Sequence, residues 1–327
     1  MVAAQDSQAR VSLVIPCYRV TEHILPVLAE IPELVNVIYC VDDGCPDASG
    51  DLVEGRCQDP RVQVLRHPHN QGVGSAMVTG YRQALSDGAE IVVKMDGDGQ
   101  MDPALLPQFL QPILAGQADY VKGNRFFVLD DLAQMPRHRV MGNAILSFMS
   151  KISSGYWQVF DPTNGYTAIH HTALSMLPLH KLHTGYFFES DLLFRLSTIR
   201  AVVTDIPHSA RYGRERSGIS LLAVVPSFAV RHLKNFSSRI FYNYFLRDFQ
   251  LASLEWILGP ALMMFGLSFG SYQWLDHMQR GVEASAGTVM LAGLPLIVGL
   301  QLLLSAIGFD VDNQPQIPLQ TRLQKQA

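Results

Sequence analysis

The sequence is poor in cysteine, in charge of one sign and in repeated segments. Its 327 residues include four cysteines, all near the N-terminus and with no Cys-x-x-Cys pair. This spacing excludes a disulfide framework and a zinc site of paired cysteines, and it predicts reduced thiols in a cytosolic compartment. A net charge of -4 does not favour a nucleic-acid partner. Residues 1–10 are polar and lack an apolar core, so we expect no secretory signal peptide.

Two runs near the C-terminus, residues 256–275 and 288–309, contain no charged side chain. As helices they would each extend about 30 Å, which matches the hydrocarbon core of a bilayer. Trp256, Tyr272 and Trp274 lie near the ends of the first run, where interfacial aromatic residues are usual. A buried helical hairpin in a soluble core is the alternative, but two uncharged runs of this length favour a pair of transmembrane helices.

The N-terminal part of the chain alternates short apolar strands with helices. We expect strands at 11–16, 36–41, 62–65, 90–93, 120–127 and 202–206. We expect helices at 21–30, 47–57, 75–85, 102–114 and 135–151. This alternation predicts an α/β domain with a mostly parallel sheet and helices on both faces. Ligands of such sheets bind outside the carboxyl ends of the strands, where three polar loops should meet. These loops are 16–19, 42–47 and 96–102.

The stretch 94–103 reads K-M-D-G-D-G-Q-M-D-P and directly follows an expected strand. Asp96 and Asp98 stand one residue apart, and the glycines between and after them allow the backbone to turn sharply beside a ligand. Two carboxylates in this place form a site for a hard divalent cation that keeps water or phosphate oxygens as further ligands. A solvated acidic turn is the alternative, and the neighbouring motifs favour the metal site.

Six motifs follow one another in a characteristic order: V-S-L-V-I-P-C-Y, V-D-D-G-C-P-D-A-S, N-Q-G-V-G-S-A-M-V-T-G, M-D-G-D-G-Q-M-D-P, G-N-R-F and G-Y-F-F-E-S-D-L-L. Over about residues 10–220 the chain resembles the family-2 nucleotide-sugar glycosyltransferases of the GT-A fold. The two C-terminal apolar runs make it similar to the branch that uses polyprenyl phosphates, which includes dolichyl-phosphate mannose and undecaprenyl-phosphate glucose synthases. The resemblance implies a Rossmann-like GT-A catalytic domain followed by interfacial helices and two transmembrane helices.

The resemblance implies a donor site for a nucleotide sugar and its metal. Asp96 and Asp98 would hold Mg²⁺ or Mn²⁺ against the diphosphate, with Asp98 the closer ligand, and the metal would neutralise charge on the leaving nucleoside diphosphate. Asp43 would contact the nucleoside, and Asp42 could share this role. For both residues turn capping is the alternative. The other implied donor contacts are Pro16, Tyr18, Val41 and Gln100.

The acceptor implied by the resemblance is a lipid phosphate, whose oxygen is already anionic at neutral pH. A strong general base is therefore not obligatory, because positioning and charge stabilisation can supply most of the catalysis. Asp191 stands where the family has an acidic residue near the acceptor, and it would act as a base, an orienting group or a structural residue. Guanidinium groups pair bidentately with phosphate. The candidates, each with a surface ion pair as its alternative, are Arg125, Arg137, Arg139, Arg211, Arg214 and Arg216.

The expected organisation has four parts. They are a catalytic domain at 1–220, membrane-surface amphipathic helices at 221–248, a two-helix transmembrane hairpin at 249–310 and a tail at 311–327. Basic residues are in excess at 221–248 and not in the loop between the apolar runs. The positive-inside rule then places the catalytic domain and both termini in the cytoplasm, in a multi-pass protein of the cytoplasmic (inner) membrane.

The sequence thus predicts a metal-dependent, inverting glycosyltransferase that moves a hexose from a UDP- or GDP-sugar to a polyprenyl phosphate on the cytoplasmic face of the membrane. Its partners would be the nucleotide sugar, the lipid acceptor and the bilayer. The sequence leaves open whether the chain forms a homo-oligomer. Transfer to a glycolipid or a cell-surface polysaccharide precursor is one alternative, and a non-catalytic membrane scaffold of the same fold is another. A cellulose- or hyaluronan-type synthase is disfavoured, since the chain lacks a Gln-x-x-Arg-Trp motif.

Overall fold

The computed structural model describes residues 9–127, 137–209 and 221–324. The chain divides into two compact units. The larger unit combines Met1–Phe236 with Pro315–Ala327, and the smaller unit covers Ser237–Gln314. The C-terminal segment therefore belongs to the same unit as the N-terminal residues, although the smaller unit separates the two in sequence.

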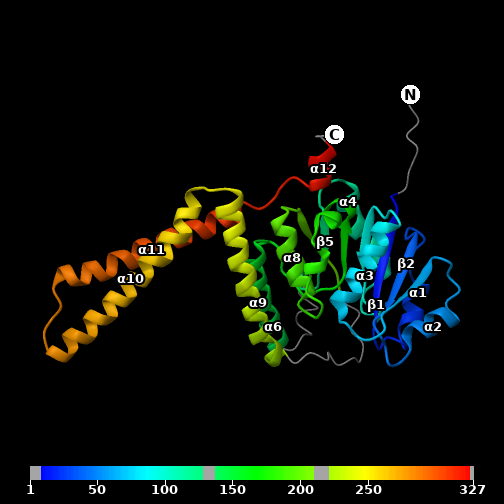
Figure 1. Ribbon diagram of the computed structural model, residues 1–327, viewed down its shortest axis with the longest axis horizontal. Helices are drawn as coiled ribbons and strands as arrows, with labels where there is room; N and C mark the ends of the chain where they lie inside the picture. The colour runs from blue at the N-terminus through cyan, green and yellow to red at the C-terminus, as the bar shows by residue number, and fades with distance from the viewer. Residues whose placement is uncertain (1–8, 128–136, 210–220, 325–327) are drawn as a thin grey trace. The chain divides into compact units, whose positions relative to one another are not determined.

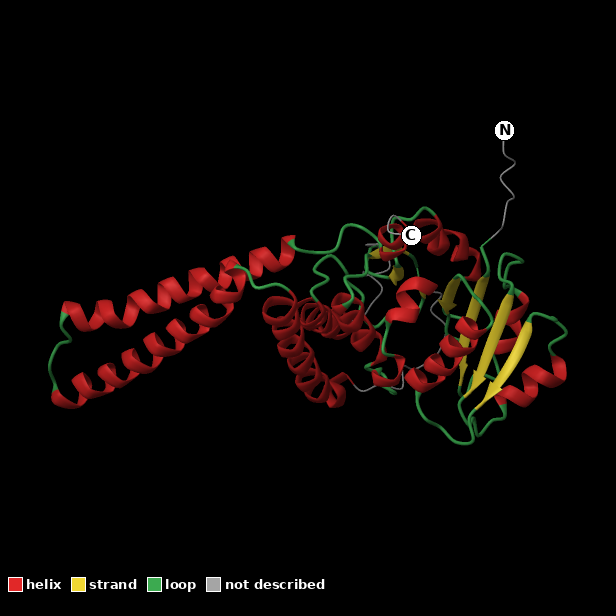
Figure 2. Cartoon of the chain, turned by 45° about the horizontal axis from the view of Figure 1, so that its top comes forward, coloured by secondary structure: helices red, strands yellow, loops and turns green. Residues whose placement is uncertain are grey.

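The larger unit is built on a seven-stranded sheet with the order β3-β2-β1-β4-β6-β5-β7. The strands are β1 (Val11–Cys17), β2 (Val37–Asp42), β3 (Val62–Arg66), β4 (Ile91–Lys94), β5 (Tyr120–Asn124), β6 (Thr167–His170) and β7 (Val203–Pro207). The short strand β6 runs antiparallel to β4 and β5, and the other neighbouring pairs are parallel. The predicted α/β class with a mostly parallel sheet is confirmed (Figures 1 and 2).

Helices cover both faces of this sheet, which explains why its central strands are mostly apolar. In β1, Leu13 and Ile15 pack into the core on one face, whereas Val14 packs into the core on the other. Successive side chains of a strand point to opposite faces, so a doubly covered strand needs apolar side chains on both faces. The first core includes α1 (Ile24–Ala29), α2 (Ser49–Arg56) and α4 (Leu106–Leu114), which follows the short helix η1 (Pro103–Leu105). The second includes α3 (Val73–Ser86), α7 (His171–Met176) and α8 (Phe188–Thr198), with η2 (Leu179–Lys181) between the last two.

Two further helices, α6 (Arg137–Ser154) and α9 (Leu221–Phe241), add a small separate core to the larger unit. Leu146 of α6 packs there against Phe187 and against Phe228 of α9. The hydroxyl of Ser153 lies 2.7 Å from His232 Nδ1, which adds a polar contact between the two helices. The N-terminal part of α9 is therefore fixed against α6 by both apolar and polar contacts.

The smaller unit contains two long helices, α10 (Leu251–Arg280) and α11 (Ala286–Asp312), joined to α9 through the π-helical segment η3 (Tyr242–Arg247). They include both apolar runs, and each is long and apolar enough to cross a membrane. The two helices run side by side in opposite directions (Figure 2). A Cβ at Gly299 would overlap the carbonyl oxygen of Gly259, so small residues allow this close packing.

Buried charged side chains in the smaller unit, among them Arg239, Asp310 and Glu255, have polar partners there. The guanidinium of Arg239 contacts both carboxylate oxygens of Asp310, at 2.6 and 3.0 Å, and the hydroxyl of Tyr244 donates to the same carboxylate at 2.7 Å. Ser305 donates to Glu255 across the two long helices at 2.9 Å. Charges in an apolar environment persist when they are paired in this way. Arg239 is one of the basic residues at 221–248, a segment that the sequence predicts to lie on the membrane surface. In the structure its side chain is buried and paired with Asp310.

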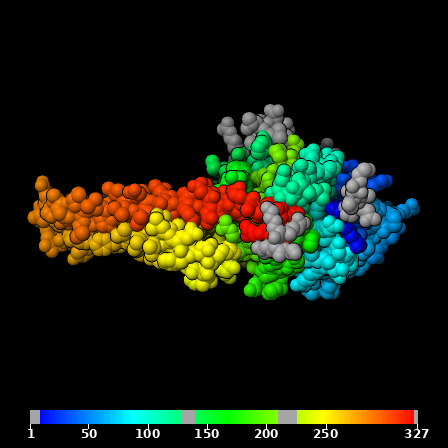
Figure 3. Space-filling model, turned by 90° about the horizontal axis from the view of Figure 1, so that it is seen from above, coloured from blue at the N-terminus to red at the C-terminus, as the bar shows by residue number. Residues whose placement is uncertain are grey.

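After α11 the chain returns to the larger unit and forms the short helix α12 (Leu319–Gln324). Asp119 is fully buried and accepts the N–H groups of Leu319 (2.9 Å) and Gln320 (3.3 Å) at the start of this helix. The same carboxylate accepts the N–H of Val202 at 2.8 Å. A carboxylate here satisfies N–H groups that have no partner within the helix. Asp119 thus fixes α12, drawn in red in Figure 3, to the larger unit.

Candidate active site

The carboxyl ends of β1, β2 and β4 lie at one edge of the sheet because these strands are parallel neighbours. Pro16 of β1 is in register with Val41 of β2, and Val14 of β1 is in register with Lys94 of β4. The loops after these strands therefore begin at the same edge, as the sequence predicts. This edge is the candidate active site.

The loop after β4 carries both acidic residues of the predicted metal site. Asp96 and Asp98 are partly exposed. The N–H of Gln100 donates to Asp98 Oδ1 at 3.1 Å, and the N–H of Asp96 lies 3.3 Å from the sulfur of Met101. Gly99 has a φ of +77°, a left-handed conformation that residues with a side chain rarely adopt. Local contacts therefore fix the shape of the loop and leave both acidic side chains accessible.

Lys94 is buried directly beneath this loop. Its Nζ lies 2.7 Å from Asp96 Oδ1 and 3.3 Å from Glu189 Oε1, and it donates to the carbonyl oxygen of Gly165 at 3.3 Å. Burial alone would lower the pKa of a lysine, but the carboxylates of Asp96 and Glu189 hold the pKa of Lys94 above its ordinary value. The loop at 95–102, which carries the predicted metal ligands Asp96 and Asp98, is called the metal loop below. Lys94 is therefore a buried cation that connects this loop to Gly165 and to Glu189.

The turn at 161–166 brings the backbone close to Asp96. A Cβ at Gly165 would overlap both Lys94 Nζ and Asp96 Oδ2, so a larger residue would displace these two side chains. The hydroxyl of Tyr166 donates to the carbonyl oxygen of Asp102 at 3.1 Å. The turn and the metal loop thus support each other.

A second buried lysine, Lys122 of β5, supports the same turn. Its Nζ donates to the carbonyl oxygen of Asn164, and burial lowers the pKa of Lys122 to about 8. The Asn164 side chain lies 2.7 Å from His208 Nε2. Arg125, a candidate phosphate ligand, pairs through Nε and Nη2 with the buried carboxylate of Asp161, at 2.7 and 3.1 Å. This ion pair corresponds to the structural alternative for Arg125, and phosphate binding by its guanidinium stays a prediction.

Asp43, the predicted nucleoside ligand, has a buried carboxylate that contacts its own chain. Its Oδ1 lies 2.7 Å from His67 Nδ1 and accepts the N–H of Gln71 at 2.9 Å, while its Oδ2 accepts the N–H of Gly72 at 2.8 Å. Asp42 likewise accepts two backbone N–H groups, at 2.8 and 2.9 Å. These contacts correspond to the alternative of turn capping, and direct contact of either carboxylate with a nucleoside stays a prediction.

The glycine loop that Asp43 holds packs against the segment before α8. The N–H of Gly74 donates to the carbonyl oxygen of Thr184 at 2.7 Å. A Cβ at Gly72 would overlap that same oxygen, and one at Gly74 would overlap the carbonyl oxygen of His183. The glycines therefore allow two stretches of backbone to approach closely at the edge of the site.

The remaining predicted donor residues differ in exposure. Tyr18 is 40 % exposed, and the guanidinium of Arg19 lies 5.5 Å from its ring centroid. Pro16 is partly buried, whereas the Val41 side chain lies entirely in the core. Tyr18 is thus an accessible aromatic ring at this edge, while Val41 is able to meet a donor only through its backbone. Their contacts with a donor stay predictions.

Asp191, predicted near the acceptor, makes contacts inside the larger unit. Its Oδ2 accepts from Arg195 Nε and from the N–H of His183, both at 3.0 Å, and its Oδ1 accepts from Asn235 at 3.3 Å. These contacts correspond to the structural alternative for Asp191. Glu189, two residues earlier, instead reaches the lysine beneath the metal loop. The motif G-Y-F-F-E-S-D offers two acidic residues, and only contacts across the fold distinguish them.

Most of the candidate phosphate-binding arginines lie where no side chain is described. Arg137 and Arg139 belong to the first turn of α6, but their side chains lie outside the described part of the chain. Arg211, Arg214 and Arg216 lie wholly outside the described residues. Phosphate binding by these five residues stays a prediction.

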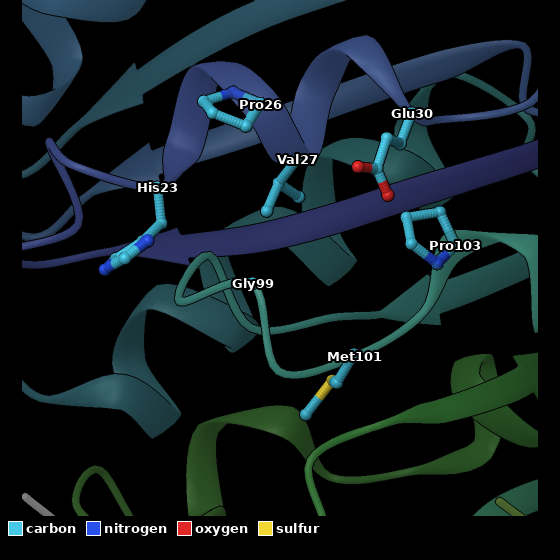
Figure 4. Close-up of a pocket in the computed structure, with 7 residues that line it drawn as sticks. All are labelled: His23, Pro26, Val27, Glu30, Gly99, Met101 and Pro103. Carbon is cyan, nitrogen blue, oxygen red and sulfur yellow. The ribbon is translucent and has the colours of Figure 1, made fainter. Parts of the chain in front are cut away.

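A small hollow lies between α1 and the segment that contains Gly99, Met101 and Pro103 (Figure 4). Its volume is about 190 Å³, below the roughly 300–1,000 Å³ of ordinary ligand pockets. Its lining residues are His23, Pro26, Val27, Glu30, Gly99, Met101 and Pro103. None of them is a predicted site residue, so we do not expect the donor to bind there.

The two carboxylates fit a divalent cation only in part. Among the described residues no group of three or more His, Cys, Asp or Glu side chains is placed to hold a metal ion. Asp96 and Asp98 supply oxygen ligands of the kind that Mg²⁺ and Mn²⁺ prefer, and Asp96 is 34 % exposed. A cation here therefore needs further oxygen ligands from a bound diphosphate or from water.

A Rossmann-like, mostly parallel sheet with an Asp-x-Asp loop at the carboxyl end of a central strand defines a glycosyltransferase domain of the GT-A type. The family model for glycosyl transferase family 2 matches residues 12–177, which is about half of the chain. The chain belongs to glycosyl transferase family 2.

The chain is also similar in sequence to several named glycosyltransferases. The chain is 31 % identical over 202 residues to an undecaprenyl-phosphate mannosyltransferase of Micrococcus luteus, with 61 % of this chain and 82 % of the relative covered. It is 29 % identical over 203 residues to a polyprenol monophosphomannose synthase of Mycolicibacterium smegmatis, with 61 % and 76 % covered. It is also 30 % identical over 179 residues to a UDP-N-acetylglucosamine–dolichyl-phosphate N-acetylglucosaminyltransferase of Methanococcus voltae, with 50 % and 71 % covered.

A solved structure shares the fold. Glucosyl-3-phosphoglycerate synthase from Mycobacterium tuberculosis, crystallised with Mn²⁺, uridine diphosphate and glucosyl-3-phosphoglycerate, matches with a TM-score of 0.53 and 20 % identity. The match covers 71 % of this chain and 80 % of the other. At this identity the likeness supports the GT-A-type fold.

Proposed function

We propose that the protein is an integral-membrane, metal-dependent, inverting glycosyltransferase. It moves a hexose from a UDP- or GDP-sugar to a polyprenyl phosphate at the cytoplasmic face of the membrane. The observation that carries this proposal is the Asp96–Asp98 loop at the carboxyl edge of a family-2 sheet, in a chain that also contains two membrane-length apolar helices. The names of three relatives, each of which acts on a polyprenyl or dolichyl phosphate, support the acceptor class.

In the donor half of the site, Asp96 and Asp98 would hold a divalent cation for the diphosphate of the donor. The cation supplies Lewis-acid stabilisation of the leaving nucleoside diphosphate. Lys94 orients Asp96, and Tyr18 offers an exposed ring at the same edge. Because the acceptor phosphate is already anionic, no residue has to remove a proton from it, and the chain contributes mainly positioning.

In the acceptor half of the site, α6 and α9 bring the larger unit to the membrane surface. Met141, Ile145 and Phe148 of α6 are 64, 46 and 60 % exposed, and Val230 and Leu233 of α9 are 69 and 65 % exposed. Large apolar side chains on two packed helices suit burial at the boundary between headgroups and acyl chains. A polyprenyl phosphate held there would keep its tail in the bilayer and present its phosphate to the domain.

The docked C-terminal helix supports the proposed topology. Residues after α11 belong to the same compact unit as the sheet, and Asp119 holds α12 there. If α10 and α11 both cross the membrane, the start of α10 and the end of α11 are on the same side of it. The catalytic domain and the C-terminus are then both cytoplasmic, as the basic residues of 221–248 favour.

The test is sugar transfer by the purified full-length protein in detergent. A panel of radiolabelled UDP- and GDP-sugars is offered with a polyprenyl phosphate and Mg²⁺ or Mn²⁺. We expect one donor to give an organic-soluble, mild-acid-labile product, and we expect EDTA to abolish it. A product stable to mild acid, formed only with a glycolipid or glycan acceptor, would favour the glycolipid alternative. Absence of transfer from every donor would favour a non-catalytic scaffold.

A further inference from the structure

Lys94 stands out because it is a fully buried cation in direct contact with a predicted metal ligand. It is the last residue of β4, two positions before Asp96. Side chains two residues apart in extended chain lie on the same side, so the strand directs the ammonium group toward that carboxylate. Its side chain is 2 % exposed, compared with 34 % for Asp96. The ion pair therefore joins the inside of the fold to the accessible loop.

The contacts of Lys94 come from three separate parts of the chain. One is the metal loop through Asp96, a second is the 161–166 turn through the carbonyl oxygen of Gly165, and the third is α8 through Glu189. The partly exposed Asp96 carboxylate has a neighbour at each oxygen, since Oδ1 contacts the lysine and Oδ2 lies close to the Cα of Gly165, where a Cβ would overlap it. The lysine and the turn thus determine the orientation of this carboxylate.

We propose that Lys94 is a positioning residue of the donor site, which holds Asp96 in one orientation and weakens the binding of a free divalent cation to the loop. The inference rests on the proposed function. An ammonium group beside a metal-binding carboxylate repels the cation, and it competes for the same oxygen. The loop then binds a cation well only when a diphosphate adds its own charge and ligands. Lys94 therefore makes the metal enter together with the donor.

This role predicts a combination of effects that loss of structure does not give. Replacing Lys94 by the neutral methionine removes the repulsion, so the affinity for Mn²⁺ alone should rise, by roughly tenfold for loss of one unit charge several ångströms away. The kcat should fall in the same variant, because Asp96 is no longer oriented. A variant with a generally damaged fold would lose both metal affinity and activity.

The experiment measures Mn²⁺ binding to the full-length protein by electron paramagnetic resonance, with and without UDP or GDP, and measures kcat and KM separately. Lys122→Met is the matched control, because Lys122 is equally buried on a neighbouring part of the sheet and contacts a carbonyl oxygen instead of Asp96. We expect Lys122→Met to leave the affinity for Mn²⁺ alone unchanged or weaker. Lys94→Arg keeps the charge and should keep the affinity for Mn²⁺ close to that of the wild type.

Lys94→Gln gives a second test if Lys94→Met does not fold. Its neutral amide keeps a hydrogen-bond donor for Asp96 but removes the charge, so the affinity for free Mn²⁺ should again rise, by roughly tenfold. The proposal is overturned if the folded neutral variant, Lys94→Met or Lys94→Gln, binds Mn²⁺ no more tightly than the wild type. Absence of Mn²⁺ binding by the wild type, with or without nucleotide, would overturn the proposed function together with this inference.

Discussion

Asp98 is the residue on which the proposed chemistry depends most directly. Asp98→Ala should reduce hexose transfer to background, because one of the two carboxylates proposed to bind the metal is lost, while the thermal unfolding temperature should change little at this partly exposed loop position. Transfer is measured with radiolabelled donor and unfolding by scanning fluorimetry. Asp102→Asn is the control, since it removes a charge from the same loop but keeps the oxygen that accepts the N–H of Ala104 at 3.0 Å. Full activity of Asp98→Ala in excess EDTA would contradict the metal site.

Asp205 of β7 shows how a buried carboxyl affects stability. Its Oδ1 is buried and has no hydrogen-bond partner within the described residues, and its Oδ2 accepts from Asn124 at 3.0 Å. Burial raises the pKa of Asp205 from 3.8 to about 6. The folded state therefore holds this proton more tightly than the unfolded chain. The resulting stabilisation is fully present below about pH 4 and is lost as the pH rises through about 6.

Asp205→Asn should raise the unfolding temperature at pH 7–8 and have less effect toward pH 5. The neutral amide avoids the cost of a buried carboxylate, which is roughly 1–3 kcal/mol for a shift of this size in a partly exposed residue. Scanning fluorimetry across this pH range measures the effect. Asp59→Asn is the opposite control, because hydrogen bonding from Arg61 lowers the pKa of Asp59, and this variant should be destabilised at pH 7. Equal shifts of Asp205→Asn at every pH would be inconsistent with the assigned cause.

At the scale of single elements, α6 is the helix predicted to bind the acceptor. It begins with Arg137 and Arg139 and continues with apolar side chains that are partly exposed. If the guanidinium groups bind the lipid phosphate, Arg137→Ala or Arg139→Ala should weaken polyprenyl-phosphate use by about tenfold to hundredfold, because a charged hydrogen bond contributes about 1.5–3 kcal/mol. Donor affinity should barely change.

The measurement compares the apparent affinity for polyprenyl phosphate with that for the nucleotide sugar. Lys151→Ala is a suitable control, because this cation near the other end of α6 donates to the carbonyl oxygen of Trp157 at 2.7 Å. Normal acceptor kinetics in both arginine variants, or a loss of donor affinity instead, would show that α6 is misassigned. The arginines at 211, 214 and 216 would then be the better candidates.

At the scale of the whole molecule, the two long helices decide the topology. A reporter fused to the C-terminus should be cytoplasmic, and one inserted near Gln279, between the apolar runs, should be on the far side of the membrane. Replacement of the basic residues at 221–248 is a useful comparison, because the orientation of a membrane protein follows the basic residues near the ends of its helices. The opposite reporter pattern, or clean extraction of the protein by carbonate, would contradict two crossings.

The sequence by itself determined the class of fold and the position of two acidic residues at one edge of the sheet. Mostly apolar strands such as 11–16 need helices on both faces of a sheet, and uncharged runs of about twenty residues need an apolar environment. Asp96 and Asp98 could be placed at the carboxyl edge because they directly follow a strand. These properties depend on side-chain type and spacing over a few residues, so they are visible without any tertiary structure.

Only the tertiary structure decided which polar groups point into the fold and what they contact. Lys94 meets Gly165 across 71 positions, and Asp119 meets Leu319 across 200. Asp43 contacts its own chain, and Glu189 rather than Asp191 contacts Lys94, the lysine beneath the metal loop. No local pattern predicts such contacts, because a buried charge is stable only beside a partner that folding brings from elsewhere in the chain.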